Sequence, residues 1–150
     1  MQWLTDLLTN PYLMTPVCAW FVAQLIKVII NAFIHKKLIW ERLFGDGGMP
    51  SGHSATVASL ATITGLLRGL GSFEFAMTAI LAIVVCHDAT GVRQETGKQA
   101  VMLNEILRIL ESEDLPEVKL KELVGHTPLQ VLAGILIGIS MAIGVFFIWF

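Results

Sequence analysis

The last part of the chain, from Pro128 to Phe150, contains no charged side chain and ends in two aromatic residues. An α-helix of about 20 apolar residues crosses the roughly 30 Å hydrocarbon core of a membrane. Three further apolar segments, at about residues 16–34, 51–70 and 73–88, have a similar character. We therefore predict an all-α integral membrane protein built as a bundle of four transmembrane helices.

The remaining segments fit a single membrane domain over residues 1–150. Hydrophobic residues make up 55% of the chain and charged residues 15%, which is too apolar for an ordinary soluble domain. Residues 2–10 predict a short interfacial helix at the N-terminus, with Trp3 and Leu4 as membrane anchors. Apolar residues recur with a helical period over residues 93–113. This pattern predicts an amphipathic helix between the third and fourth spans, lying on the membrane or over the loops.

The distribution of positive charge predicts the orientation in the membrane. Four spans place residues 35–50 and 88–127 on one face, and only Arg68 lies at the other. The positive-inside rule assigns the richer face to the cytoplasm. The net charge of −2 gives no argument for a nucleic-acid partner. The cations of the predicted cytoplasmic face are Lys36, Lys37, Arg42, Arg93, Lys98, Arg108, Lys119 and Lys121.

The longest polar interruption is the glycine-rich stretch from Gly45 to Ser54, just before the second span. Glycines let backbone N–H groups approach a ligand closely. Ser51 can cap the helix that follows, and a helix N-terminus attracts anions. His53 then lies one turn into that helix. The stretch predicts a phosphate site at a membrane surface.

A polar stripe runs along the first span, because Gln24, Lys27, Asn31 and His35 share one helix face. A lysine within a span is costly and usually faces the bundle interior or a polar cavity. Lys27 could instead extend its amine to the membrane surface. Because the whole stripe is polar, we favour a functional role for Lys27.

The third span ends in Asp88, and Arg93 follows five residues later. The two side chains could form an ion pair at the helix end. Alternatively, both could line the same polar site as the glycine-rich stretch.

A second histidine, His126, precedes the fourth span. Thr127 is a good N-cap, Pro128 suits the first helical position, and Gln130 completes a capping box. His126 therefore lies just outside a helix N-terminus, at the same membrane face as His53. Two histidines beside an anion-binding loop and several cations suggest phosphoryl transfer. One histidine can attack phosphorus while the other protonates the leaving oxygen.

These residues carry a resemblance to a known family. Pro50-Ser51-Gly52-His53 matches the central motif of the type 2 phosphatidic acid phosphatase superfamily, which includes the vanadium-dependent haloperoxidases. Together with the blocks at residues 88–93 and 125–128, it makes the chain resemble that superfamily's divergent small-membrane-protein branch, from about Gln24 to Gly138.

The resemblance implies a role for each matching residue. His53 would be the general acid, His126 the nucleophile that forms a phosphohistidine, and Ser51 and Gly52 would bind phosphate oxygens. The implied reaction is hydrolysis of a lipid phosphate monoester without a required metal or other cofactor. The superfamily's membrane enzymes usually have six spans, so a homodimer could complete the bundle.

The chain departs from the family pattern at several positions. The first motif is not intact, although Lys27 and Arg42 are available as phosphate-binding cations. The arginine expected before His126 is absent, and Arg93 could supply that charge. Gln130 replaces the aspartate that orients the nucleophile. Our hypothesis is that Asp88 or Asp46 takes that catalytic role.

Two other functions stay open. Asp46, Asp88 and Asn104 carry oxygen ligands that suit Mg²⁺, which would fit a metal-dependent membrane phosphotransferase. The missing arginine and aspartate would fit a non-enzymatic lipid-phosphate binder or transporter. The sequence does not identify which lipid phosphate is the substrate.

Overall fold

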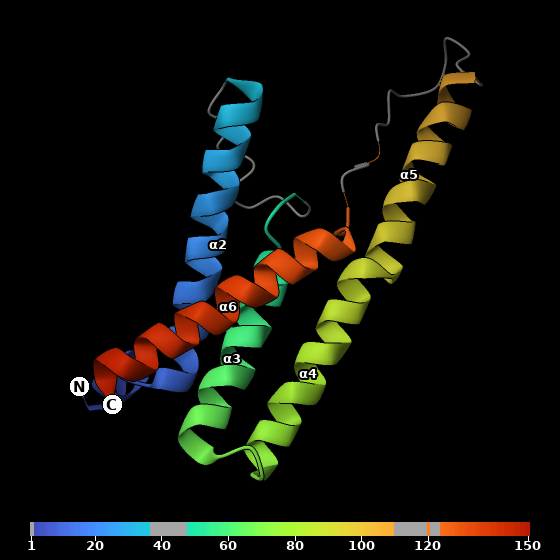
Figure 1. The fold of residues 1–150 in the computed structure, drawn as a ribbon. Helices are drawn as coiled ribbons and strands as arrows, with labels where there is room; N and C mark the ends of the chain where they lie inside the picture. Colours follow the sequence, from blue (N-terminus) through green and yellow to red (C-terminus); the bar gives the residue numbers. More distant parts are fainter. Residues whose placement is uncertain (1, 37–47, 110–119, 121–123) are drawn as a thin grey trace.

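The computed structural model describes residues 2–36, 48–109, 120 and 124–150, and every regular element within them is a helix (Figure 1). The predicted all-α class is confirmed. The helices are α1 (Gln2–Leu8), α2 (Pro11–His35), α3 (Gly52–Arg68), α4 (Phe73–Thr90), α5 (Val92–Ile109) and α6 (Pro128–Trp149).

Three segments of the described chain are long and apolar enough to cross a membrane: α2 over Pro11–Ile34, α4 continuing into α5 over Phe73–Ile109, and α6 over Pro128–Trp149. The predicted span over residues 51–70 forms α3, which is not among them. Helix α3 has only 17 residues and carries several serines and threonines. The described chain is thus all-helical with three candidate spans, one fewer than the four that the sequence predicts.

Helix α3 lies at the centre of the fold, in contact with α2, α4 and α6. Its buried residues are mostly small, including Ala55, Ala58 and Ser59. Small side chains let helix backbones approach closely, which favours helix packing within a membrane. Helix α6 crosses α3 obliquely (Figure 1).

Two glycines of α6 make this crossing close. A Cβ on Gly134 would lie 3.1 Å from Ser54 Cβ, and a Cβ on Gly138 would lie 2.9 Å from the Ser59 nitrogen. Either methyl would also meet a backbone carbonyl of α3. The small size of Gly134 and Gly138 therefore permits the close contact of α6 with α3, whereas a Cβ on Gly144 of the same helix would meet nothing within 4 Å among the described residues.

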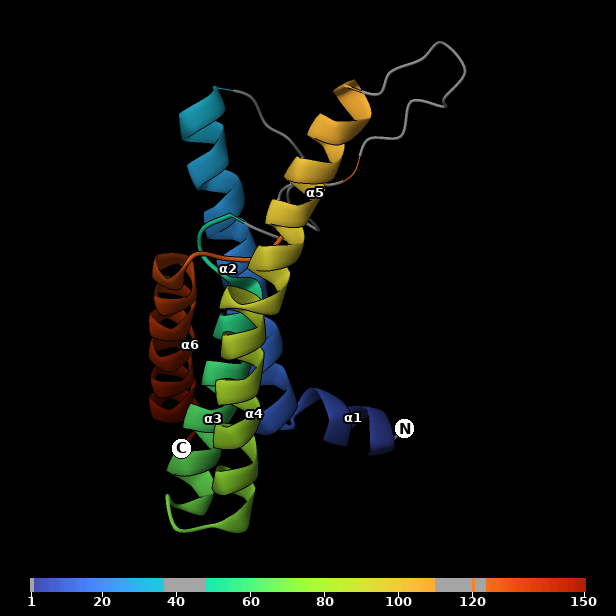
Figure 2. The ribbon, with the colours of Figure 1, turned by 90° about the vertical axis from the view of Figure 1, so that its right-hand side faces the viewer.

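The two peripheral helices differ in how well they match the sequence. Helix α1 projects sideways from the other helices, as an interfacial helix would (Figure 2). Helix α5 continues roughly along the direction of α4 beyond Gly91, so the prediction that it lies over the loops is wrong (Figures 1 and 2). Its apolar side chains, including Met102 and Ile109, are exposed. The helical pattern fixed the existence of α5 but could not fix its direction.

Candidate functional site

The N-termini of α3 and α6 lie side by side, next to the point where α4 passes into α5 (Figure 1). The backbone N–H of Ser51 donates to the carbonyl oxygen of Gln130 over 3.0 Å. The backbone N–H of His126 donates to the carbonyl oxygen of Ala89, near the end of α4, over 2.9 Å. These bonds bring together the loop before α3, the segment before α6 and the end of α4.

Ser51 caps α3, as the sequence predicts. Its Oγ accepts the backbone N–H of Ser54 at 3.3 Å and the hydroxyl of Ser54 at 2.9 Å. The Ser51 side chain is fully buried, so it supports the helix end from inside. A cap of this kind leaves the first N–H groups of the helix, including that of Gly52, without helical partners. Those groups are the ones suited to an anion.

Gly52 is buried at a contact between α3 and α2. A Cβ at this position would lie 3.3 Å from Trp20 Cδ1 and 3.7 Å from Gln24 Cδ. The absence of a side chain therefore lets the start of α3 pack directly against α2. This packing places the helix end next to the buried polar residues of α2.

His53 and His126 come together from different helix ends. Their ring centroids are 6.3 Å apart, and the ring planes are inclined by 57°. His53 is exposed, whereas His126 is only 4% exposed. The two imidazoles, one exposed and one buried, therefore lie close enough to act on the same bound group.

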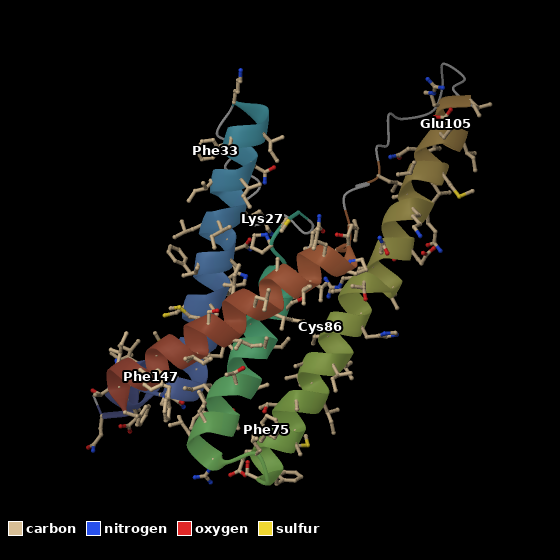
Figure 3. All side chains as sticks on the ribbon, viewed as in Figure 1. Lys27, Phe33, Phe75, Cys86, Glu105 and Phe147 are labelled. Carbon is tan, nitrogen blue, oxygen red and sulfur yellow. The ribbon has the colours of Figure 1, made fainter. Side chains whose placement is uncertain are left out.

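Lys27 of α2 lies on the side of this helix that faces the loop before α3 (Figure 3). Its side chain is 3% exposed. Gly48 adopts φ +85°, and a Cβ there would be 3.8 Å from both Cγ and Cδ of Lys27. The charge of Lys27 also acts on the His126 ring. Of the two interpretations of Lys27, the buried position facing the site is the one observed.

The surroundings of His126 lower the pKa of its imidazole below the ordinary value. Burial is the largest cause, and the positive charges of Lys27 and His53 act in the same direction. The Gln130 side chain and the Gly48 backbone oppose them by hydrogen bonding to the ring. Among the described residues, Nδ1 of His126 has no hydrogen-bond partner. The lowered pKa favours the neutral imidazole, which is the nucleophilic form of histidine.

Asp88 and Arg93 form the ion pair that the sequence left as one of two interpretations. Arg93 Nε donates to Asp88 Oδ2 over 2.7 Å, and both side chains are about two-fifths exposed. Within the described part of the chain, no interaction joins Asp88 to the His126 ring. The pair is close to the His126 segment through backbone packing, because a Cβ on Gly125 would lie 2.6 Å from the carbonyl carbon of Arg93.

The remaining predicted residues are placed as follows. Arg42 and Asp46 lie outside the described residues. Asn104 is bonded to the backbone of Leu120, since its Nδ2 donates to the carbonyl and its Oδ1 accepts the N–H, both over 2.9 Å. Over residues 2–36, 48–109, 120 and 124–150, no group of three His, Cys, Asp or Glu side chains is placed to hold a metal ion.

The sequence-based site omitted Gln24, Gly48 and Gln130. Gln24 is 6% exposed, and its Oε1 has no partner among the described residues. Its position three residues before Lys27 on one helix face was the available signal. Gln130 is drawn to His126 by the capping box, in which its Oε1 accepts the Thr127 N–H over 3.0 Å. Gly48 belongs to the glycine-rich stretch, but its contact with Lys27 could not be predicted locally because it depends on packing against α2.

The fold and the site define an integral membrane protein with a polar, histidine-containing site at the ends of its helices. The chain belongs to the Divergent PAP2 family, which it matches over residues 8–141. It is 41% identical over 150 aligned residues to the uncharacterized membrane protein YuiD of Bacillus subtilis (strain 168), covering 92% of this chain and 95% of that protein. No solved structure matches the chain.

Proposed function

We propose that this protein is a membrane phosphatase that hydrolyses lipid phosphate monoesters through a phosphohistidine intermediate. The observation that carries the proposal is the pairing of exposed His53 with buried His126 at a ring separation of 6.3 Å, next to the buried charge of Lys27. A neutral, water-shielded imidazole is a nucleophile, and an exposed one can exchange protons with the solvent.

The reaction follows in two steps. A nitrogen of His126 attacks phosphorus, the bond from phosphorus to the lipid oxygen breaks, and His53 gives that oxygen a proton. A water molecule then attacks the phosphohistidine, His53 accepts the proton from the water, and inorganic phosphate leaves as His126 is restored. Lys27 and the N–H groups at the start of α3 stabilise the negative charge on the phosphoryl oxygens.

The other predicted site residues support this reaction indirectly. Ser51 holds the α3 N-terminus, and Gly52 contributes its backbone N–H. Arg93 supplies a cation near the substrate, and Asp88 orients Arg93. Arg42, just before the glycine-rich stretch, is a further phosphate-binding cation.

We further propose that α3 completes a four-helix membrane bundle with α2, α4 and α6 over a single domain. The histidines then lie at the cytoplasmic face, where the cationic segments are. An amphiphilic phosphate such as phosphatidate, phosphatidylglycerophosphate or a polyprenyl phosphate can reach this position from within the lipid. A homodimer would enlarge the bundle towards the six spans usual in the wider superfamily.

The test is phosphate release by the purified protein from a panel of these three lipid phosphates, with and without a chelator. We expect release from at least one lipid, loss of release in His126→Ala, and retained release in His87→Ala, which removes another exposed histidine. Trapping of labelled phosphate on His126 would identify the intermediate. No release from any lipid overturns the proposal.

The two alternatives predict different results in the same experiment. A metal-dependent phosphotransferase would lose activity with the chelator, through carboxylates such as Asp88. A non-enzymatic binder would retain lipid phosphate without releasing phosphate. The unpartnered Nδ1 of His126 is the observation that favours the binder, because no carboxylate of the described residues orients this ring.

A further inference from the structure

A cavity with a mostly apolar wall and a charged pair at its edge lies far from the two histidines, at the turn between α3 and α4. It is a space of about 350 Å³ between the start of α2, the last turns of α3 and the start of α4. This volume falls within the range of small-molecule binding sites. The cavity is lined by Tyr12, Leu60, Thr64, Arg68, Glu74 and Thr78.

Thr64 is the unusual residue in this lining. Its side chain is 2% exposed, and its Oγ1 has no partner among the described residues. Other threonines of the same hairpin satisfy their hydroxyls within the helix, as when Thr56 donates to Gly52 O and Thr62 to Ala58 O. A buried polar atom without a partner calls for a bound water or ligand.

The mouth of the cavity carries one cation and one anion. Nε and Nη2 of Arg68 both donate to a single oxygen of Glu74, Oε1, over 3.1 and 2.6 Å. The pair is therefore not a bidentate one that uses both carboxylate oxygens. Among the described residues, Nη1 of Arg68 has no hydrogen-bond partner. Both side chains are about half exposed, at 54% and 47%. The charges can thus receive further partners from outside.

The side chains that α3 contributes to the cavity change in chemical character along the helix. Leu60, Thr64 and Arg68 lie four residues apart on one helix face, so each step inward from the membrane surface is about 6 Å. From the mouth inward the lining offers a guanidinium, a hydroxyl donor and an apolar side chain. A glycerophospholipid presents a phosphate, an ester carbonyl and an acyl chain in the same order.

We propose that this cavity binds a glycerophospholipid whose headgroup carries an ammonium group. The phosphate binds Arg68, the ester carbonyl accepts the Thr64 hydroxyl, and the first acyl carbons contact Leu60. The ammonium binds the Glu74 carboxylate. With an uncharged or purely anionic headgroup, the single positive charge of Arg68 would have to offset both the phosphate and Glu74. The site therefore favours phosphatidylethanolamine over phosphatidylglycerol.

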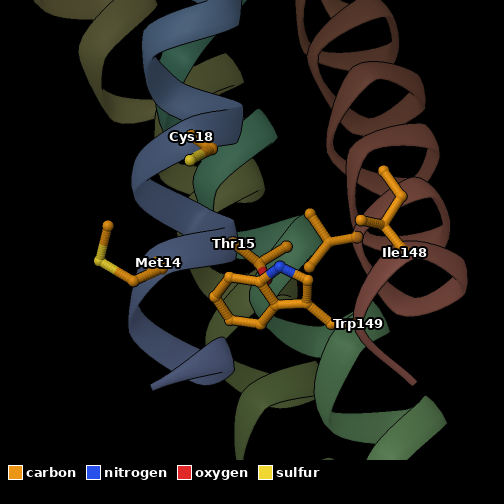
Figure 4. Close-up of a pocket in the computed structure, with 6 residues that line it drawn as sticks. Met14, Thr15, Cys18, Ile148 and Trp149 are labelled. Atoms are coloured by element: carbon orange, nitrogen blue, oxygen red, sulfur yellow. The ribbon is translucent and has the colours of Figure 1, made fainter. Parts of the chain in front are cut away.

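A nearby cavity shows the contrast. It measures about 130 Å³ between α2 and the last turns of α6, and no charged side chain lines it (Figure 4). Thr15 there also lacks a partner for its Oγ1 among the described residues. Without a charged mouth, that cavity has nothing to hold a headgroup. Its lining residues are Met14, Thr15, Cys18, Val145, Ile148 and Trp149.

The experiment measures lipid retained by the full chain. The protein is delipidated in detergent, reconstituted into nanodiscs with equal amounts of phosphatidylethanolamine and phosphatidylglycerol, extracted, and weighed by native mass spectrometry. We expect one phosphatidylethanolamine to be retained preferentially. Thr64→Val should lower retention about fivefold and Arg68→Gln about tenfold, as the loss of a neutral and of a charged hydrogen bond.

Controls separate this site from a folding defect and from the histidine site. Thr62→Val removes a hydroxyl of the same helix that bonds to Ala58 O over 2.7 Å, and it should leave retention unchanged. Thr64→Val should melt no lower than the wild type, because it removes an unpartnered hydroxyl. His126→Ala should retain lipid normally, so the result does not depend on phosphatase activity.

Three outcomes would overturn the proposal. Equal retention by Thr64→Val and Thr62→Val would mean that only water meets the Thr64 hydroxyl. Glu74→Gln should abolish the preference for phosphatidylethanolamine, and an unchanged preference would remove the assigned role of the carboxylate. Equal binding of the soluble headgroup glycerophosphoethanolamine would show that no acyl chain occupies the cavity.

Discussion

The backbone N–H of Ser51 donates a 3.0 Å hydrogen bond to the carbonyl oxygen of Gln130. This single bond joins the N-terminal ends of α3 and α6, which carry or adjoin the two histidines. His53 follows Ser51 by two positions, and His126 lies beside the capping box that Gln130 completes. The relative placement of the rings therefore rests on backbone contacts. Substituting either histidine should therefore affect the reaction without separating the two helix ends.

The first prediction concerns the packing that supports this bond. Gly134→Ala or Gly138→Ala should destabilise the protein by about 1–3 kcal/mol, since the added methyl meets the backbone of α3. Phosphate release should fall in parallel, because the α6 N-terminus would shift away from Ser51. Thermal unfolding in detergent and phosphate release check the two effects.

Gly144 provides the matched control for this prediction. It lies in the same helix, and a Cβ there meets nothing within 4 Å among the described residues. Gly144→Ala should leave the melting temperature unchanged or raise it slightly, because alanine has the higher helix propensity. A similar loss of stability in all three variants would contradict the packing explanation.

The local features of the site could be predicted from the sequence. The N-cap at Ser51 and the capping box at Thr127 depend on residues within three positions of each other, and both are present. The close packing at Gly134 and Gly138 follows from the small size of glycine. The matching motifs also indicated the family correctly.

The remaining features depend on contacts between distant segments. Hydropathy does not distinguish a helix that faces lipid from one surrounded by other helices, so it gave no sign that α3 is central. The burial of His126 and its contact with Gly48 require the loops to meet in space. The direction of α5 depends on the backbone at Gly91, which a helical pattern does not encode. These contacts have no signature within a short window of sequence.

The second prediction concerns Gly125, which adopts φ +85° just before His126. A Cβ at this position would lie 2.7 Å from Gln94 Cα as well as meeting the Arg93 carbonyl carbon. Gly125→Ala should displace the His126 segment from α5. We expect turnover to fall at least tenfold, since small misplacements of catalytic groups are costly.

Gly69 provides a control that distinguishes the steric clash at Gly125 from the strain of a positive φ. It also has φ +85°, but a Cβ there meets nothing within 4 Å in the described part of the chain. At φ 85° and ψ 149°, Gly69→Ala therefore carries the strain of a conformation that favours glycine, without the clash, at about 1–3 kcal/mol. It should lower stability while turnover per folded protein stays near the wild-type value. Equal losses of turnover in both variants would contradict the placement of His126 by Gly125.

The third prediction is a pH dependence. Burial and the charges of Lys27 and His53 lower the pKa of His126, so the attacking neutral ring persists below the ordinary histidine value of about 6.5. The rate should fall as pH decreases through this lowered pKa. Lys27→Met removes one of the causes, so the acid limb of kcat/KM should move to higher pH. The maximal rate should also fall, because a phosphate-binding cation is lost.

Lys98→Met is the control for this shift. Lys98 is an exposed lysine of α5, with a side chain 63% accessible to solvent. Its loss changes the net charge as Lys27→Met does, yet the acid limb should stay in place. An acid limb that does not move in Lys27→Met would contradict the electrostatic contact between Lys27 and His126.

The fourth prediction tests the role of Asp88. Its carboxylate accepts a 2.7 Å hydrogen bond from Arg93 and holds that guanidinium beside the segment that carries His126. Asp88→Asn should raise KM for the lipid phosphate several-fold, because Arg93 loses its orientation, and should change kcat less. Stability should change by at most about 1 kcal/mol, since the pair is partly exposed.

Glu95→Gln is the control for this prediction. It breaks an ion pair of the same length, with Lys98, and should leave KM unchanged. A kcat loss greater than about a hundredfold would instead mean that Asp88 orients His126 directly. Unchanged kcat and KM in Asp88→Asn would remove this residue from the site.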